Sequence, residues 1–169
     1  LDDIADLVSV LRRRPASYVI RGSLKNAGVR LVTGGQLIRR CHTQDRTPDP
    51  PLEDCPQHWC MVDVDNYVIP SGMTLGSDSL IRHVIRDVLP IEFHPAACVW
   101  SLSSSTGLTT DLLKCHLWFW LVEAMTSDAL KRTLRGRSRV DLGLYTPSQP
   151  HYTADPILIA GDDPFARCR

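Results

Sequence analysis

The stretch Met61-Val62-Asp63-Val64-Asp65 ends an apolar, β-favouring segment that begins at Trp59. Side chains alternate along a strand, so Asp63 and Asp65 share one face while the two valines take the other. Two aspartates held side by side repel each other unless a cation lies between them, and carboxylate oxygens suit hard cations such as Mg²⁺ and Mn²⁺. The motif indicates a divalent-metal site; the alternative is a strand end whose aspartates point into solvent.

Strand and helix patterns alternate from this stretch to residue 145. The expected elements are a strand at 59–65, a helix at 77–89 capped by Ser77 or Asp78, strands at 96–101 and 114–122, a helix at 127–134 capped by Ser127, and a strand at 140–145. This β-α-β-β-α-β order is typical of the split βαβ unit, an antiparallel four-stranded sheet with two helices on one face. The predicted fold class is therefore α+β.

The pattern in the rest of the chain is less regular. It predicts an amphipathic helix at 2–14 ended by Pro15, short strands at 18–20, 29–32 and 156–159, and a proline-rich loop at 47–56. With 169 residues the chain can bury one sizeable core. We expect a single domain in which residues 1–56 form a small α/β unit packed against residues 57–169.

The composition excludes some classes of protein. Hydrophobic residues make up 43% and charged residues 22%, which is typical of a soluble globular protein, and no apolar run is long enough to span a membrane. A net charge of +0 argues against a protein that coats nucleic acid by charge alone, but allows a local basic groove. Six cysteines without a CxxC pair predict a reducing, cytoplasmic setting. One group matches no standard zinc module, so zinc is not expected; it comprises Cys41, His42, Cys55, His58 and Cys60.

Three further features follow the two aspartates along the chain. Lys114 and His116 share one face of their strand, where an anionic ligand would offset their mutual repulsion; the alternative is a buried histidine bonded to a carbonyl. The loop 101–107 is rich in serine, and Ser103 and Ser105 suit phosphate binding, although a flexible exposed hairpin has the same composition. Asp141 lies on the strand that the split βαβ order places beside the first one. Three carboxylates, Lys114 and His116 would then form a two-metal site for nucleotidyl transfer.

Taken in order, these motifs resemble those of the archaeo-eukaryotic-type primases, in the form found in plasmid and phage primase-polymerases. The resemblance covers residues 18–165 and rests on Val62-Asp63-Val64-Asp65, on Ser103-Ser104-Ser105 with Lys114-Cys115-His116, and on Val140-Asp141. The chain departs from the family in two ways: no serine stands two positions before His116, and the zinc-binding element of many members is not recognisable.

The resemblance implies an RRM-like catalytic half and template-directed synthesis of primers from NTPs or dNTPs with two Mg²⁺ or Mn²⁺ ions. Asp63, Asp65 and Asp141 would be the metal ligands, and Lys114 and His116 would hold the triphosphate with help from Ser103 and Ser105. The partners would be single-stranded DNA template, a primer strand and a helicase, fused to this chain or separate from it.

Weaker candidates for contact with nucleic acid are Arg39, Arg40, Arg135, Arg137, Arg139 and Tyr152. Runs of basic residues are often solvated faces, and aromatic residues near strands are often part of the core. Two other functions are compatible with the sequence. An RRM-like nucleic-acid-binding module would bind without metal, but it would normally carry stacking aromatics rather than aspartates on its sheet face. A metal-dependent nuclease or another nucleotidyltransferase would use the same carboxylates.

Overall fold

A computed structural model of the chain describes residues 1–25, 51–107, 112–159 and 165. Its elements in chain order are α1 (Asp2–Arg12), β1 (Tyr18–Ile20), β2 (Ser23–Leu24), β3 (Leu52–Glu53), β4 (Gln57–Tyr67), α3 (Asp78–Val88), the 3₁₀ helix η2 (Ile91–Phe93), β5 (Val99–Leu102), β6 (Leu113–Met125), α4 (Ser127–Thr133), the 3₁₀ helix η3 (Leu142–Leu144) and β7 (Pro150–Tyr152). The predicted α+β class is confirmed. No helix in the described part of the chain is long and apolar enough to cross a membrane.

The central sheet is antiparallel, with the strand order β4-β6-β5. The apolar residues of β4 and β6 alternate with polar ones near the aspartates, which separates the two faces of the sheet. Val62, Val64, Cys115 and Leu117 point to one face, and all four are fully buried there. Asp63 lies opposite His116 on the other face.

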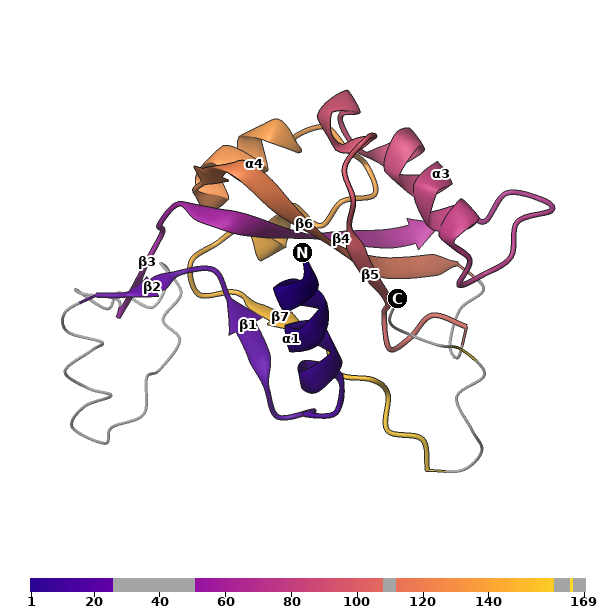
Figure 1. The fold of residues 1–169 in the computed structure, drawn as a ribbon, viewed down its shortest axis with the longest axis horizontal. Coiled ribbons are helices and arrows are strands. Elements are labelled where there is room, and N and C mark those ends of the chain that lie inside the picture. Colours follow the sequence, from indigo (N-terminus) through magenta and orange to yellow (C-terminus); the bar gives the residue numbers. More distant parts are fainter. Residues whose placement is uncertain (26–50, 108–111, 160–164, 166–169) are drawn as a thin grey trace.

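Helices α3 and α4 cover the first face (Figure 1), and among the described residues the sheet has three strands instead of the four that the sequence predicted. The apolar stripe of α3 is buried against the sheet, and the helix begins at Ser77, whose hydroxyl accepts a hydrogen bond from the Leu80 amide. The predicted cap of α4 is wrong. The cap is Thr126, whose hydroxyl accepts from the Ala129 amide at 3.1 Å, and Ser127 is the first helical residue.

The second face is partly covered by the N-terminal unit, which lies on the side of the sheet away from α3 and α4 (Figure 1). Ile4 and Val8 of α1 pack with Met61 of β4 and with a small cluster that also contains Val99, Trp118 and Leu144. β1 of this unit pairs with β7, although the two strands lie near opposite ends of the chain. The part of β4 that carries Asp63 therefore lies at the edge of this second core.

Two predicted strands are not formed. Val140 makes a single bridge to Val64, and the chain then turns into η3 instead of continuing as a strand over 140–145. Residues of one strand two or four positions apart would share a face, yet Val140 packs in the core under the helices and Leu144 packs in the core under α1. The chain therefore crosses the sheet edge.

The predicted strand at 156–159 is also absent, and Ile157 and Ile159 are exposed with no neighbouring strand among the described residues. A short apolar run forms a strand only when a pairing edge and a packing surface are present. The short C-terminal strand is β7 instead, which sequence reasoning missed. The strand predicted at 29–32 lies outside the described residues.

Arg21 is fully buried and ties the N-terminal unit to the sheet. Its guanidinium donates to the carbonyl oxygens of Trp59 and Met125, lies 5.0 Å from the centre of the Trp59 ring, and is 3.4 Å from the Ser127 hydroxyl. We expect Arg21→Met to lower the free energy of unfolding by about 3 kcal/mol, because buried carbonyl oxygens lose their donors. Urea unfolding of Arg21→Met beside the exposed control Arg135→Met measures the loss; an equal effect of the two variants would contradict it.

Candidate active site

Two rows of polar side chains cross the second face of the central sheet, the face that the N-terminal unit partly covers. In the first row, Asp63 of β4, His116 of β6 and Ser101 of β5 lie opposite one another in register. In the second row, the Lys114 ammonium lies 3.2 Å from a carboxylate oxygen of Asp65. The alternation of β4 and β6 brings these four predicted residues, Asp63, Asp65, Lys114 and His116, together on one face.

Asp141 reaches the same face through the bridge at Val140. The Asp65 amide donates to the Arg139 carbonyl at 2.8 Å, and the Asp141 amide donates to the Asp63 carbonyl at 3.1 Å. Because Val140 is turned into the core beneath the helices, the next residue, Asp141, faces the opposite way. The third predicted carboxylate is therefore adjacent to the first, although the strand that was expected to carry it is only one bridge long.

A bulge at Asn66 ends this row of aspartates. Asn66 adopts φ 54°, a left-handed conformation that asparagine tolerates better than most residues, and the pairing of β4 with β6 shifts register between Val64 and Tyr67. Without the bulge, Tyr67 would share a face with Asp63 and Asp65. With it, Tyr67 turns into the core under α3, and its hydroxyl donates to Asp87 at 3.1 Å.

The electrostatics at Asp63 are unfavourable for a charged carboxylate. Burial raises its pKa to about 7; the negative charges of Asp65 and Asp141 add to that rise, and Lys114 opposes it. Burial also lowers the pKa of His116 to about 4, so its imidazole is neutral at pH 7. The His116 Nε2 lies 3.7 Å from Asp63 Oδ1, too far for a hydrogen bond. A buried carboxylate beside two others is stabilised by a bound cation.

Each carboxylate of the cluster faces a group of the protein itself in this conformation. Lys114 pairs with Asp65, His116 faces Asp63, and Asp141 accepts a hydrogen bond from the Gly143 amide at 2.8 Å. Accordingly, no group of three or more His, Cys, Asp or Glu side chains is arranged to hold a metal ion anywhere in the described part of the chain. The donor set has the chemistry that Mg²⁺ or Mn²⁺ requires, and the buried Nδ1 of His116 has no hydrogen-bond partner among the described residues. Binding of a metal would require these side chains to turn toward it.

The serine-rich loop is anchored to the same strand. The Ser103 amide donates to the Lys114 carbonyl at 2.9 Å, and the Thr106 hydroxyl donates to that same carbonyl at 2.7 Å. Ser103 and Ser105 are both half-buried in this turn. Ser101 was not among the predicted residues; it is buried on β5, opposite His116 of β6. Because Ser101 stands two residues before Ser103, strand alternation could have predicted that it shares a face with Ser103.

The weaker candidates lie in three places. Arg139 is next to the carboxylates, with its guanidinium donating to the Asn66 carbonyl at 2.8 Å. Arg135 and Arg137 are exposed on the segment after α4. Tyr152 belongs to the β1–β7 pair, half-exposed and packed edge-on against Tyr18, rather than to the central sheet. Arg39 and Arg40, with Cys41 and His42 of the cysteine–histidine group, lie outside the described residues.

His151 is the second residue whose setting the sequence did not reveal. It is fully buried, its ring packs edge-on against Trp59, and neither ring nitrogen has a hydrogen-bond partner among the described residues. Burial lowers its pKa to about 4, and the positive charge of Arg21 and the His116 ring act in the same direction. β7 places it there by pairing Val19 with His151, a contact between the two ends of the chain.

We expect His151 to weaken the fold at acidic pH. Because its pKa is lower in the folded than in the unfolded chain, the unfolded state binds more protons between pH 6.5 and 4, and stability falls as the pH falls through that window. His151→Phe removes this loss, so the difference in unfolding free energy between variant and wild type should grow by up to about 3 kcal/mol from pH 7 to pH 4. Urea unfolding at both pH values measures it. A difference that is the same at both pH values would contradict the prediction.

Comparison with protein-family models, with curated proteins and with solved structures finds no match to this chain.

Proposed function

We propose that this protein is a DNA-templated nucleotidyltransferase of the primase-polymerase type, which makes or extends primers on single-stranded DNA. The observation that carries the proposal is the juxtaposition of Asp63, Asp65 and Asp141 with Lys114 and His116 on one face of the sheet. Phosphoryl transfer needs positioned negative ligands for Mg²⁺ or Mn²⁺ and positive or neutral donors for the phosphates. Both kinds of group are present in this cluster.

The residues divide into two roles. Asp63, Asp65 and Asp141 would hold two divalent cations, which, when bound, activate a 3′-hydroxyl and neutralise the pyrophosphate leaving group. Lys114 would release Asp65 and pair with a phosphate of the incoming nucleotide. His116 is neutral at pH 7 because of its burial, so it would donate one hydrogen bond to a phosphate without adding charge. Ser101, which lies opposite His116, and Ser103 and Ser105 in the loop that follows it would lie near the same phosphates.

A metal-independent nucleic-acid-binding module is the second candidate, and two observations favour it. Every carboxylate of the cluster already faces an internal partner. In addition, the half-exposed Trp120 ring stacks on His58 at the far end of β4 and β6, with the ring centres 5.6 Å apart. An exposed aromatic pair of this kind can stack on a base.

One assay distinguishes the two candidates. The full chain is mixed with labelled NTPs or dNTPs and with primed or unprimed single-stranded DNA, in Mg²⁺, Mn²⁺ or EDTA. Short products on the unprimed template support a primase, and extension of the primed template alone supports a polymerase that needs an initiation partner. Products that do not follow the template indicate a different nucleotidyltransferase. DNA binding that EDTA leaves unchanged, with no incorporation on either template, would reject the proposal in favour of the binding module.

A further inference from the structure

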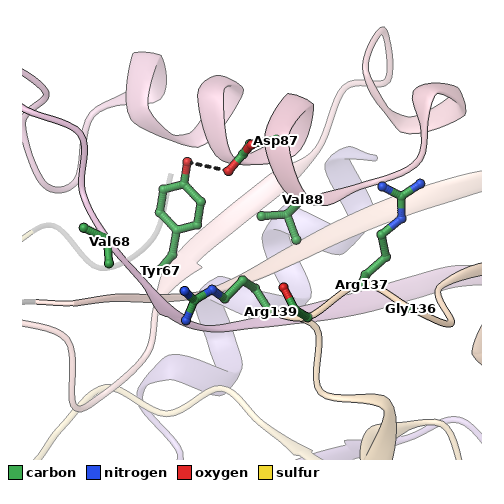
Figure 2. A pocket seen from close by; sticks show the side chains of 8 residues that line it. Tyr67, Val68, Asp87, Val88, Gly136, Arg137 and Arg139 are labelled. Atoms are coloured by element: carbon green, nitrogen blue, oxygen red, sulfur yellow. Dashed lines mark hydrogen bonds between the residues drawn. The ribbon is translucent and has the colours of Figure 1, made fainter.

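A pocket of about 410 Å³ lies beyond the end of the aspartate row, on the side of the sheet that α3 covers (Figure 2). Its lining residues are Tyr67, Val68, Asp87, Val88, Gly136, Arg137, Ser138 and Arg139. The last turn of α3 forms one wall, and the loop that leads from α4 to the bridge at Val140 forms the other. This volume is within the usual range for small-molecule sites.

The pocket exists because of the bulge at Asn66. The bulge turns Tyr67 away from the aspartates and toward Asp87, and it leaves the Asn66 carbonyl as the acceptor for the Arg139 guanidinium. The backbone of Arg139 also accepts a hydrogen bond from the Asp65 amide. The pocket and the candidate active site are therefore adjacent, joined by the backbone hydrogen bond between Asp65 and Arg139, but they use different side chains.

The charges around the pocket favour a ligand that is anionic at one end. Arg137 and Arg139 contribute two positive charges, and Asp87 contributes one negative charge and accepts a hydrogen bond from the Tyr67 hydroxyl. Arg139 is held against the Asn66 carbonyl, whereas the exposed Arg137 guanidinium has no hydrogen bond or ion pair within the described ranges. Figure 2 shows the Arg137 side chain rising beside the wall formed by α3.

We propose that this pocket binds a nucleoside phosphate. Arg137 contacts the phosphate, since a guanidinium group matches phosphate oxygens in geometry and charge. The Arg139 guanidinium, which points away from Arg137 (Figure 2), adds positive charge to the lining. Asp87 accepts hydrogen bonds from the sugar hydroxyls or the base amino group. The same chemistry is offered by a free nucleotide and by the phosphorylated end of a nucleic-acid strand. Because no residue of the carboxylate cluster takes part, binding requires no divalent metal and does not depend on the function proposed above.

Calorimetric titration in EDTA tests the proposal, with the full chain carrying Asp63→Asn and Asp65→Asn so that the aspartate cluster cannot hold metal. The probes are adenosine monophosphate, adenosine, inorganic phosphate, and oligodeoxythymidine with and without a 5′-phosphate. We expect adenosine monophosphate to bind at least tenfold more tightly than adenosine. Arg137→Ala should weaken its binding at least tenfold, whereas Arg14→Ala, which removes an exposed arginine outside the pocket, should leave it unchanged.

Asp87→Asn adds a second test, in which two ligands should respond in opposite directions. The substitution keeps the hydrogen bond from Tyr67, because the amide oxygen still accepts it. The substitution should weaken the binding of adenosine monophosphate, because the pocket loses an acceptor for the sugar hydroxyls. It should tighten the binding of inorganic phosphate, because the pocket loses a charge that repels the phosphate. Tighter binding of the 5′-phosphorylated oligonucleotide than of adenosine monophosphate assigns the pocket to a strand end, and the reverse assigns it to a free nucleotide. Equal binding of adenosine and adenosine monophosphate, or equal effects of Arg137→Ala and Arg14→Ala, would overturn the proposal.

Discussion

Asp63→Asn is expected to abolish nucleotide incorporation and, at the same time, to stabilise the fold. The loss of activity should be at least about 10³-fold, the scale on which removal of one group that stabilises transition-state charge acts. The gain in stability follows from burial and from the neighbouring Asp65 and Asp141, which raise the pKa of Asp63 to about 7. A carboxylate that resists ionisation opposes folding once it is charged, and the isosteric amide carries no charge.

The pH dependence of this gain has a definite sign. Because the folded chain holds the Asp63 proton more tightly than the unfolded chain, wild-type stability from this group falls as the pH rises from about 4 to about 7. Asparagine does not titrate. The variant should therefore equal the wild type near pH 4 and exceed it by up to about 4 kcal/mol above pH 7 in EDTA. Comparing the two chains at each pH cancels the opposite contributions of His116 and His151, which both share.

Two measurements check this prediction together. Urea unfolding in EDTA at pH 4.5 and 8 gives the stability difference, and primer extension in Mn²⁺ gives the activity. Leu121→Met, a partly buried volume-conserving change on the opposite face of β6, serves as the control and should alter neither strongly. A variant that is both inactive and less stable than the wild type at pH 8 would show that Asp63 is a structural residue and not a group strained for function.

The parts of the fold that were predicted correctly have strong local patterns. The alternation of β4 and β6 defines both faces of the sheet, and the apolar stripe of α3 with its cap at Ser77 fixes a helix from local signals alone. The four residues Asp63, Asp65, Lys114 and His116 meet because strand alternation and antiparallel register are enough to bring them together.

The parts that were missed depend on contacts between distant residues. Val140 to Tyr145 has a strand-like composition, but Val140 and Leu144 belong to different cores, and no local pattern reveals this. His151 is buried because β7 pairs with β1 from the other end of the chain. Tyr67 follows the alternation of Asp63 and Asp65 in the sequence and leaves it in the structure because of one left-handed residue, Asn66.

Lys114→Met is expected to change metal binding and nucleotide binding in opposite directions. The Lys114 ammonium lies 3.2 Å from a carboxylate oxygen of Asp65, with both side chains partly exposed. A cation that pairs with a metal ligand competes with the metal, so its removal should tighten Mn²⁺ binding in the absence of nucleotide, by about tenfold. With a triphosphate present the same lysine is a partner of the phosphates. Loss of a charge-assisted hydrogen bond should then weaken triphosphate binding about 10- to 100-fold.

The opposed signs separate a catalytic role for Lys114 from a structural one. If Lys114 served only to neutralise Asp65, its removal would tighten Mn²⁺ binding and leave the triphosphate affinity unchanged. If Lys114 served only to hold the strands together, both affinities and the stability of the fold would fall. Calorimetric titration with Mn²⁺ alone, and with a non-hydrolysable triphosphate in saturating Mn²⁺, gives the two affinities. Lys131→Met on α4 makes the same change in net charge away from the cluster and should move neither. Only the split result, tighter metal and weaker triphosphate, agrees with a lysine that leaves Asp65 for the phosphates when the site fills.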